Sequence, residues 1–271
     1  MPKSRKKRTP ITHSTKSRAS SSRSHSSRSV IRRFHVLLKR RAQFQATRSS
    51  KELVDIENQI EEMGGLERYQ QMSSIGQGSD RGGGSEKVLI KWLKDHNLNV
   101  NRHIKIKLLE VGALKPDNYG SCSSWIDCTP MDLRSRHPSI LEQDFLLLNE
   151  NEHFTSWDVI SLSLVLNFVP EPKDRGHMLR LAHSLLVPDG YLFLALPLPC
   201  VSNSRYLNFQ HLKALMTAIG FLELRDKWKE GGKMVYWLYQ KRTATHISLD
   251  NFHKKVSLRN GNRRNNFCIL L

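Results

Sequence analysis

The sequence predicts an α/β domain with a doubly wound, mostly parallel sheet over about residues 101–242. Three observations predict this fold class. Apolar runs of strand length alternate with helical patterns from about residue 104 onward. One run, Gly190–Pro197, is almost wholly apolar, as a strand covered on both faces is. The last two expected strands lack room for a crossover helix between them, so an antiparallel final strand is expected.

Each element of this domain follows from a local pattern. Short apolar runs bounded by turn residues predict strands at 105–111, 125–131, 157–163, 190–196, 221–228 and 233–240. Apolar residues at helical spacing predict helices at about 172–187 and 208–219. The alternation of these elements makes the first strands parallel neighbours, which places their carboxyl ends at one edge of the sheet.

A helical element is expected before the sheet. Helical spacing of the apolar residues predicts a helix over 51–63, which Gly64-Gly65 ends, and a second one over 87–97. In the second helix, the residues expected to face inward are Val88, Leu89, Trp92 and Leu93. A basic amphipathic helix is also compatible with Val30 to Phe44. A glycine-rich loop, Gly76–Gly84, separates the two predicted helices.

Charge divides the chain into four parts. Residues 1–50 contain 15 Lys or Arg and no Asp or Glu, and are expected to form a largely disordered basic arm. The helical element at 51–100 and the sheet domain at 101–242 follow. A basic tail is expected at 243–271, because residues 241–271 hold 7 Lys or Arg and one Asp. The net charge of +18 therefore belongs to the two ends.

A basic arm of this kind suits a polyanion such as RNA, because neutralised phosphates release counterions. A membrane surface is the competing partner, but the arm lacks the apolar face of an interfacial helix. A solvated tail with an import signal is the simpler alternative. The run Lys3-Ser4-Arg5-Lys6-Lys7-Arg8 favours nuclear or nucleolar targeting. No apolar run reaches membrane-spanning length, so no membrane association is expected.

Several classes of site have no support in the sequence. The four cysteines (Cys122, Cys128, Cys200 and Cys268) form no CxxC pair and have no histidine cluster beside them. They are expected to be reduced intracellular thiols, and no metal site is expected. Motifs of hydrolases and kinases, such as GxSxG, HExxH and the phosphate-binding P-loop, are also missing.

The first strand runs into Glu110-Val111-Gly112, and Asp132 follows the glycine by 20 positions. A glycine at this turn allows close approach of a ligand, and the later carboxylate can accept hydrogen bonds from ribose hydroxyls. The segment from Gly112 to Pro116 lacks the further glycines of a GxGxxG turn, which disfavours NAD and FAD. A nucleoside cofactor without a pyrophosphate, such as S-adenosylmethionine, remains compatible. An ordinary turn glycine and an exposed carboxylate are the open alternative.

Two later strand ends carry further candidates. Asp144 can accept a hydrogen bond from an adenine amino group while Phe145 covers the ring; a turn Asp and a core Phe are the alternative. After the strand at 157–163, Asn167 supplies an amide and Phe168 a stacking face. For these two, a helix-capping Asn and a core Phe remain open. Asn167 is the candidate catalytic residue and Phe168 a candidate substrate contact.

The strand at 190–196 leads into a stiff turn with two prolines, which then presents Arg205 and Tyr206. Arg205 can hold a phosphate or carboxylate, and Tyr206 can stack on a base. Both are candidate substrate-binding residues. A stiff surface loop with no binding role is the alternative.

Together, LLEVGA, the strand end at Asp132, FTSWDVISLSLVLNFVP, PDGYLFLALPLPCVSNSRY and the strand at Gly220-Phe221 resemble the class I S-adenosylmethionine-dependent methyltransferases. These have a Rossmann-like sheet. The chain resembles the fungal 25S rRNA adenine-N1 methyltransferases still more closely, over about residues 50–242. The resemblance implies a nucleolar enzyme that uses S-adenosylmethionine to methylate N1 of one adenine of large-subunit rRNA in the pre-ribosome. Gly112 and Asp132 would be its cofactor residues.

One segment departs from the class pattern. Pro116 and Gly120 follow Gly112, so the usual first helix must be short or broken. This leaves open how the methionine end of the cofactor is held. The glycine-rich loop with Arg81 is a candidate to cover it.

Two other functions are alternatives to this enzyme. A related family resembles this one in its core and acts as a non-catalytic S-adenosylmethionine sensor in TORC1 signalling. Such a protein needs no RNA-binding arm, so the 15 basic residues of the arm favour the enzyme. A nicotinamide-dependent dehydrogenase is disfavoured by the missing glycines.

Overall fold

The computed structural model describes residues 50–65, 84–100, 104–135, 137–242 and 249–271, with scattered positions from 33 to 44. The positions described between 33 and 44 are helical, and Phe34 and Leu37 among them are buried. The basic arm up to residue 32 and residues 66–83, which include Arg81, lie outside the described residues. The predictions for the arm and for most of the glycine-rich loop therefore stay predictions.

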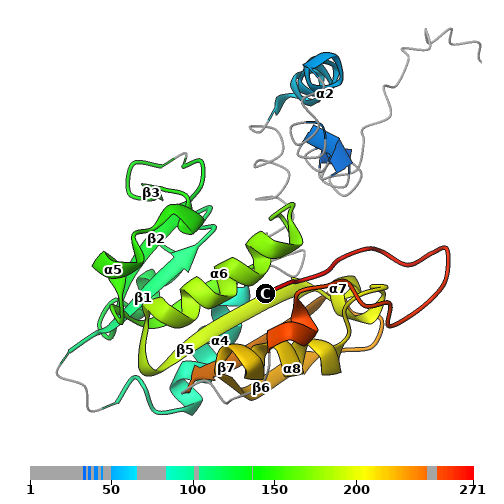
Figure 1. The fold of residues 1–271 in the computed structure, drawn as a ribbon. Coiled ribbons are helices and arrows are strands. Elements are labelled where there is room, and N and C mark those ends of the chain that lie inside the picture. Colours follow the sequence, from blue (N-terminus) through cyan, green and yellow to red (C-terminus); the bar gives the residue numbers. More distant parts are fainter. Residues whose placement is uncertain are drawn as a thin grey trace, which may run out of the picture.

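One seven-stranded sheet forms the centre of the molecule, in the order β3-β2-β1-β4-β5-β7-β6 (Figure 1). Strands β1 to β5 pair in parallel, and β7 is antiparallel to both β5 and β6. This confirms the predicted mostly parallel sheet with an antiparallel final strand, the class I methyltransferase arrangement. The bounds are β1 Ile106–Val111, β2 Ile126–Asp132, β3 Leu141–Glu142, β4 Trp157–Ser163, β5 Leu186–Pro197, β6 Phe221–Trp228 and β7 Met234–Lys241.

Alternate residues of the central strands build two apolar cores, one on each face of the sheet. In β5, Leu192 and Leu194 belong to one core, whereas Phe193 and Ala195 belong to the other. The first core packs under α6 and α8, and the second packs under α4. The helices are α2 Ser50–Glu62, α4 Ser85–Asp95, α5 Glu150–His153, α6 Pro172–Leu185, α7 Pro199–Ser202 and α8 Phe209–Ile219.

The predicted helix over 87–97 is α4, two residues earlier than expected. Leu89, Trp92 and Leu93 are buried, and Val88 is partly buried against the same core. The helix packs on the sheet through these residues; Trp92 meets Phe193 of β5 edge-on at 5.9 Å between ring centroids. The expected inward face is therefore confirmed.

The largest boundary error lies between α6 and β5. The helix ends at Leu185 and the strand begins at Leu186, four residues before the expected start at 190. Pro188 explains this early end, because the residue before a proline is disfavoured in helical conformation. The short β3 and α5 were also not predicted. Between β1 and β2 the only helical turn described is the 3-10 turn Gly120–Cys122, which confirms that the usual first helix is short or broken.

The residues after β7 return to the sheet domain. The C-terminal segment, residues 249–271, places Phe252, Phe267 and Ile269 in the core under α6 and α8. The backbone N–H of Leu270 donates to the carbonyl of Pro172 at 3.0 Å, which fixes the segment at the start of α6. Figure 1 shows it in red and orange beside α8 and α7. The division of the chain at residue 243 stays a prediction. The described residues of the predicted tail, 249–271, pack against the sheet domain.

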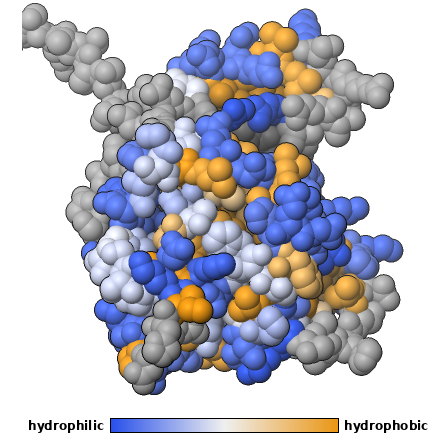
Figure 2. Space-filling view, turned by 90° about the vertical axis from the view of Figure 1, so that its left-hand side faces the viewer, coloured by the Kyte–Doolittle hydropathy of each residue, from blue (hydrophilic) through white to orange (hydrophobic). Residues whose placement is uncertain are grey.

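The opposite side of the molecule, at the β3 edge of the sheet, faces the viewer in Figure 2. Hydrophobic residues on this face form separated patches among hydrophilic ones (Figure 2). Across the ranges that the structure describes, no helix is both long and apolar enough to span a bilayer.

Candidate functional site

Gly112 and Asp132 lie at the carboxyl ends of the neighbouring strands β1 and β2. The N–H of Gly112 donates to the carbonyl of Met131 at 2.8 Å, so the turn after β1 rests beside Asp132. Gly112 has a φ of 79°, and a Cβ there would lie 2.8 Å from Cγ2 of Val165. The turn therefore requires glycine for conformation and for space. The structure brings the predicted pair together, whereas its part in binding stays a prediction.

The carboxyl of Asp132 is half-buried at the strand end. One of its oxygens accepts a hydrogen bond from the backbone N–H of Arg134 at 2.8 Å. Burial raises the pKa of Asp132, and the nearby Glu142 carboxylate adds to that effect. A further donor, such as a hydroxyl, would stabilise the ionised form.

Glu110 is a site residue to which the sequence reasoning assigned no role. It is 8% exposed at the end of β1, and its Oε1 accepts a hydrogen bond from Nδ2 of Asn118 at 2.7 Å. Its Oε2 is buried and has no hydrogen-bond partner among the described residues. Burial raises the pKa of Glu110 to about 7. The sequence indicated Glu110 only through its position in the Glu-Val-Gly motif at a strand end. That its Oε2 is buried without a hydrogen-bond donor among the described residues is seen only in the structure.

The start of α4 lies at the same edge. The hydroxyl of Ser163, the last residue of β4, donates to the hydroxyl of Ser85 at 2.7 Å. The negative charge of Glu86 in the first turn of α4 also contributes to the raised pKa of Glu110. The glycine-rich loop therefore ends, at Gly84, beside the carboxyl ends of β1 and β4. This is the crevice in which open α/β sheets bind ligands, because strand order reverses there.

The loop after β4 carries Asn167 and Phe168. It opens with Leu164 at a φ of 60°, whose N–H donates to the carbonyl of Ala195 at 2.9 Å. Within the described chain, Oδ1 of Asn167 is buried without a hydrogen-bond partner. Phe168 is half-buried. Among the residues that the structure describes, the crevice thus contains two buried acceptors without donors, Glu110 Oε2 and Asn167 Oδ1.

Asp144 lies close to Asp132, because the N–H of Gln143 donates to the Asp132 carbonyl at 3.0 Å. Its Oδ1 caps a 3-10 turn by accepting from the N–H of Leu146 at 2.9 Å. Phe145 is 3% exposed and belongs to the core under α6 and α8. For Phe145 the packing matches the core alternative rather than a ring cover. Asp144 is half-buried, and its part in binding stays a prediction.

Arg205 and Tyr206 lie on a different loop, after α7. The expected stiff turn contains this short helix. Nη1 of Arg205 donates to Oδ1 of Asn266 at 2.6 Å and Nη2 to the carbonyl of Gly261 at 3.1 Å, so the C-terminal segment holds the guanidinium. Tyr206 is half-buried. The N–H of Arg205 donates to the carbonyl of Asn265. The loop that carries Asn167 is linked to the same segment through Arg175, which donates to the carbonyls of Val169, Pro170 and Cys268.

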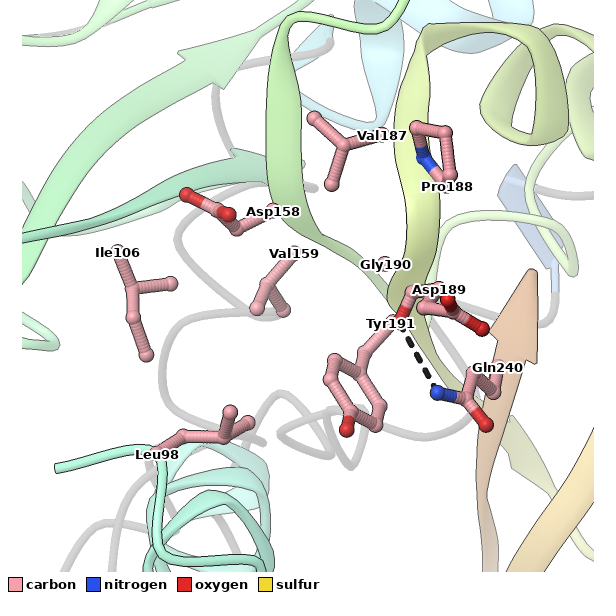
Figure 3. Close-up of a pocket in the computed structure, with 10 residues that line it drawn as sticks. All are labelled: Leu98, Ile106, Asp158, Val159, Val187, Pro188, Asp189, Gly190, Tyr191 and Gln240. Carbon is pink, nitrogen blue, oxygen red and sulfur yellow. Dashed lines mark hydrogen bonds between the residues drawn. The ribbon is translucent and has the colours of Figure 1, made fainter. Parts of the chain in front are cut away.

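A cavity of about 180 Å³ lies at the other edge of the sheet (Figure 3). It is near the amino ends of β1 and β4, so none of the candidate residues lines it. Inside it, Nε2 of Gln240 donates to the carbonyl of Asp189 at 3.2 Å. Its lining consists of Leu98, Ile106, Asp158, Val159, Val187, Pro188, Asp189, Gly190, Tyr191 and Gln240. Among residues with described positions, no three His, Cys, Asp or Glu side chains are grouped to hold a metal ion.

The sequence of this chain was compared with those of known proteins, and two curated relatives match it over most of its length. The chain is 38% identical over 221 residues to the 25S rRNA (adenine(2142)-N(1))-methyltransferase of Saccharomyces cerevisiae, covering 80% of this chain and 63% of that protein. It therefore spans less than two thirds of that relative. It is 36% identical over 255 residues to the 25S rRNA adenine-N(1) methyltransferase of Schizosaccharomyces pombe, covering 89% and 91% of the two chains.

A solved structure and a family model complete the comparison. The Burkholderia thailandensis 1,6-didemethyltoxoflavin-N1-methyltransferase, crystallised with S-adenosylhomocysteine, is 15% identical with a TM-score of 0.47, over 59% of this chain and 79% of that one. This likeness is too distant to bear on the site. The model of the family described as "25S rRNA (adenine(2142)-N(1))-methyltransferase, Bmt2" matches residues 54–269. The match includes the crevice, the loops that carry Asn167 and Arg205, and nearly all of the C-terminal segment, and the chain belongs to this family.

Proposed function

We propose that this protein is an S-adenosylmethionine-dependent methyltransferase that methylates N1 of an adenine in 25S rRNA. The observation that carries the proposal is membership of that family over residues 54–269. The crevice supports it, because Glu110 and Asn167, at the carboxyl ends of β1 and β4, each offer a buried oxygen for which the described part of the chain supplies no donor. A ligand with donor groups would complete both.

The residues of the crevice fit S-adenosylmethionine, which supplies an electrophilic methyl group on a sulfonium when bound. Oε2 of Glu110, which has no donor among the described residues, would accept a hydrogen bond from the ammonium group of the methionine moiety. Glu110 would thereby hold the methionine end of the cofactor. Asp132 would accept from the ribose hydroxyls, and Asp144 from the adenine amino group. The bare backbone at Gly112 allows close approach to the ligand.

The target adenine needs no deprotonation, because N1 carries a lone pair. The protein therefore acts mainly by positioning, which supplies roughly 7–11 kcal/mol in favourable cases. N1 lies on the Watson–Crick edge, so the base must be unpaired or flipped out. Phe168 or Tyr206 would stack against it, and Asn167 would meet its edge.

Asn167 also suits the charge that develops during transfer. Methylation leaves the adenine cationic, and an amide oxygen turned toward it stabilises positive charge. Oδ1 of Asn167 is buried and has no donor among the described residues, so it is available for that role. We therefore keep Asn167 as the candidate catalytic residue.

We also propose that the protein acts in the nucleolus on the pre-ribosome. The basic run from Lys3 to Arg8 supports this location. A fluorescently tagged chain should co-localise with a nucleolar marker, and replacing the four Lys and Arg residues at 5–8 with Gln should disperse it. Retention of the variant in the nucleolus would contradict the targeting role of this run.

The function is tested by mapping methylated adenines in rRNA from a strain that lacks this gene. One adenine of 25S rRNA should lose its N1 methyl group, and the wild-type gene should restore it. A non-catalytic sensor would bind S-adenosylmethionine in isothermal titration yet leave rRNA methylation unchanged. A dehydrogenase would bind NAD in the same titration.

The site is tested by Gly112→Arg in the complemented strain. The φ of residue 112 is in the left-handed region, which disfavours arginine, and the added side chain would collide with a methyl group of Val165. Cofactor binding and methylation should therefore both be lost. Gly120→Arg, in the nearby exposed turn, is the matched control and should complement. Normal methylation by Gly112→Arg would refute the site assignment.

A further inference from the structure

The loop at residues 258–265 of the C-terminal segment is fixed to the chain that follows β5. The N–H of Leu258 donates to the Arg205 carbonyl at 2.9 Å, and the N–H of Arg205 donates to the Asn265 carbonyl at 2.9 Å. The N–H of Asn265 in turn donates to the Asn203 carbonyl at 3.1 Å. Because β5 ends at Pro197, this loop lies on the carboxyl-end side of the sheet, beside α7 (Figure 1).

Positive charge is concentrated in this segment. Asp250 is the only Asp or Glu in the sequence from 249 to 271, against five Lys or Arg. Arg259 donates to the backbone carbonyls of Val201 at 2.6 Å and Leu207 at 3.2 Å. Arg264 donates to Oδ1 of Asn203 at 3.2 Å.

Arg205, Arg259 and Arg264 are thus held by neutral oxygens. Within the described ranges, no ion pair joins any of them to a carboxylate. Lys254, Lys255 and Arg263 are exposed on the same segment. Guanidinium groups held by neutral oxygens and exposed cations, with no ion pair among the described residues, favour a phosphate-bearing partner.

The aromatic ring of Tyr206 lies among these basic side chains. The Arg205 guanidinium carbon is 5.9 Å from the centroid of the Tyr206 ring, and Nζ of Lys255 is 6.0 Å from it. A ring beside two cations matches a nucleotide, whose base stacks while its phosphate meets the charge. A lipid headgroup would use the cations but not the ring face. The combination therefore favours single-stranded RNA over a membrane.

A second aromatic side chain lies on the same edge. Trp228, at the end of β6, is 47% exposed, and it pairs with Val235, which in turn pairs with Leu196 near the end of β5. Its ring is 5.0 Å from that of Phe209, three residues after Tyr206. Lys227 and Lys229 flank it in the sequence and are exposed. An exposed aromatic ring therefore lies between Tyr206 and the hairpin of β6 and β7, where Asp226 and Glu230 match the two lysines in number.

We propose that Tyr206, together with Lys254, Lys255 and Arg263 of the C-terminal segment, forms a surface that binds 25S rRNA next to the methylation crevice. The three exposed cations contact phosphates, and Tyr206 stacks on an unpaired base. This surface is folded and belongs to the sheet domain. The inference rests on the proposed function and specifies how its substrate is held.

The test compares two triple variants of the full chain. Lys254→Gln/Lys255→Gln/Arg263→Gln removes three charges from the surface, and Lys94→Gln/Lys105→Gln/Lys107→Gln removes three exposed charges near the amino ends of the strands. The dissociation constant for an unmodified 25S rRNA transcript is measured over a salt series. The first variant should lower the salt slope by about 2 and weaken binding roughly tenfold to a hundredfold, whereas the control should match the wild type.

Stacking is tested separately at Tyr206. Tyr206→Phe should keep the affinity for the transcript, and Tyr206→Leu should weaken it about fivefold to a hundredfold. Isothermal titration with S-adenosylmethionine should give the wild-type affinity for every variant, because the crevice is unchanged. A loss of folding would reduce cofactor binding as well, so this readout separates it from a loss of RNA contact.

The outcomes separate this inference from the proposed function. If the surface variant binds RNA as tightly as the control variant does, the surface is wrong while methylation by the wild type still stands. If the surface variant loses affinity for vesicles containing phosphatidylserine but not for RNA, the partner is wrong. If the wild type neither binds nor methylates 25S rRNA, the proposed function itself fails.

Discussion

Nη1 of Arg175 donates a hydrogen bond of 2.5 Å to the backbone carbonyl of Cys268, across 93 positions of the sequence. The same side chain donates through Nε to the Val169 carbonyl at 2.8 Å and through Nη2 to the Pro170 carbonyl at 2.9 Å. Its guanidinium carbon lies 4.5 Å from the centroid of the Phe267 ring. One buried cation therefore fastens the loop that carries Asn167 to the C-terminal segment.

Arg175→Met should destabilise the protein strongly. Methionine fills much of the same space but leaves three backbone carbonyls without their donor in a buried site. We expect the free energy of unfolding in urea to fall by about 3 kcal/mol. Arg180→Met, on the exposed side of α6, should change it by less than about 0.5 kcal/mol. Equal effects of the two substitutions would show that the three bonds contribute nothing.

Gly176→Ala tests the close approach of the C-terminal segment to α6. An alanine in place of glycine inside a helix is usually stabilising, by about 0.5–1 kcal/mol. Here the added Cβ would lie 1.8 Å from the backbone carbonyl oxygen of Leu270, so the segment must move away. We expect a loss of about 1–3 kcal/mol by urea denaturation.

Gly120→Ala is the matched control for Gly176→Ala. Its Cβ would meet the nearest heavy atom, Cβ of Asp117, at an ordinary 3.7 Å. Its free energy of unfolding should stay within about 0.5 kcal/mol of the wild type. A stabilised Gly176→Ala variant would mean that the segment does not rest on the helix.

Glu110→Gln should change how stability depends on pH in the ligand-free protein. The folded pKa of about 7 exceeds the ordinary 4.5, so the folded state holds this proton more tightly than the unfolded state does. The wild type should therefore lose stability as pH rises from about 4.5 through 7, by at most about 3 kcal/mol. Glutamine does not ionise, so the variant should lack this loss and become the more stable protein at pH 8.

Urea denaturation of both proteins between pH 5 and 8 measures this difference. Asp117→Asn removes an exposed carboxyl nearby and is the matched control for the substitution itself. Parallel curves for Glu110→Gln and the wild type would contradict the buried, unpartnered state of Glu110. The same variant should bind S-adenosylmethionine more weakly, because it lacks a carboxylate for the ammonium group.

Asn167→Ala should lower kcat for methyl transfer about a hundredfold, the effect of removing one electrostatic contact to the reacting group. The KM for S-adenosylmethionine should change little, because Asn167 is assigned to the base. Asn151→Ala, an exposed asparagine of α5, is the control and should keep the wild-type kcat. An unchanged kcat in Asn167→Ala would remove it from the list of catalytic candidates.

Local patterns in the sequence were sufficient to predict most of the sheet. The strand at 157–163 was placed at its observed bounds, and the antiparallel final strand followed from the short connection after Trp228. Both depend on neighbouring residues only. The packing of the C-terminal segment could not be predicted in this way, because its partners, such as Pro172 and Arg175, lie almost a hundred positions away.

The candidate site was predictable to a similar degree. The turn at Gly112 and its proximity to Asp132 follow from strand length and parallel pairing, which are sequence-local. The sequence identified Glu110 only as part of a motif. The burial of its Oε2 without a donor among the described residues depends on the positions of Asn118 and α4, which the local sequence does not give. Phe145 is an apolar residue after a turn, and only tertiary packing decides that such a ring lies in the core.

The central claim is that this chain transfers a methyl group to N1 of an adenine in 25S rRNA. The most direct measurement incubates the purified full chain with unmodified 25S rRNA and methyl-labelled S-adenosylmethionine, then identifies the labelled nucleosides by mass spectrometry. The account predicts labelled 1-methyladenosine with the wild type and none with Gly112→Arg. A wild-type chain that binds S-adenosylmethionine but labels no adenosine, or labels it only at another atom, would contradict the account.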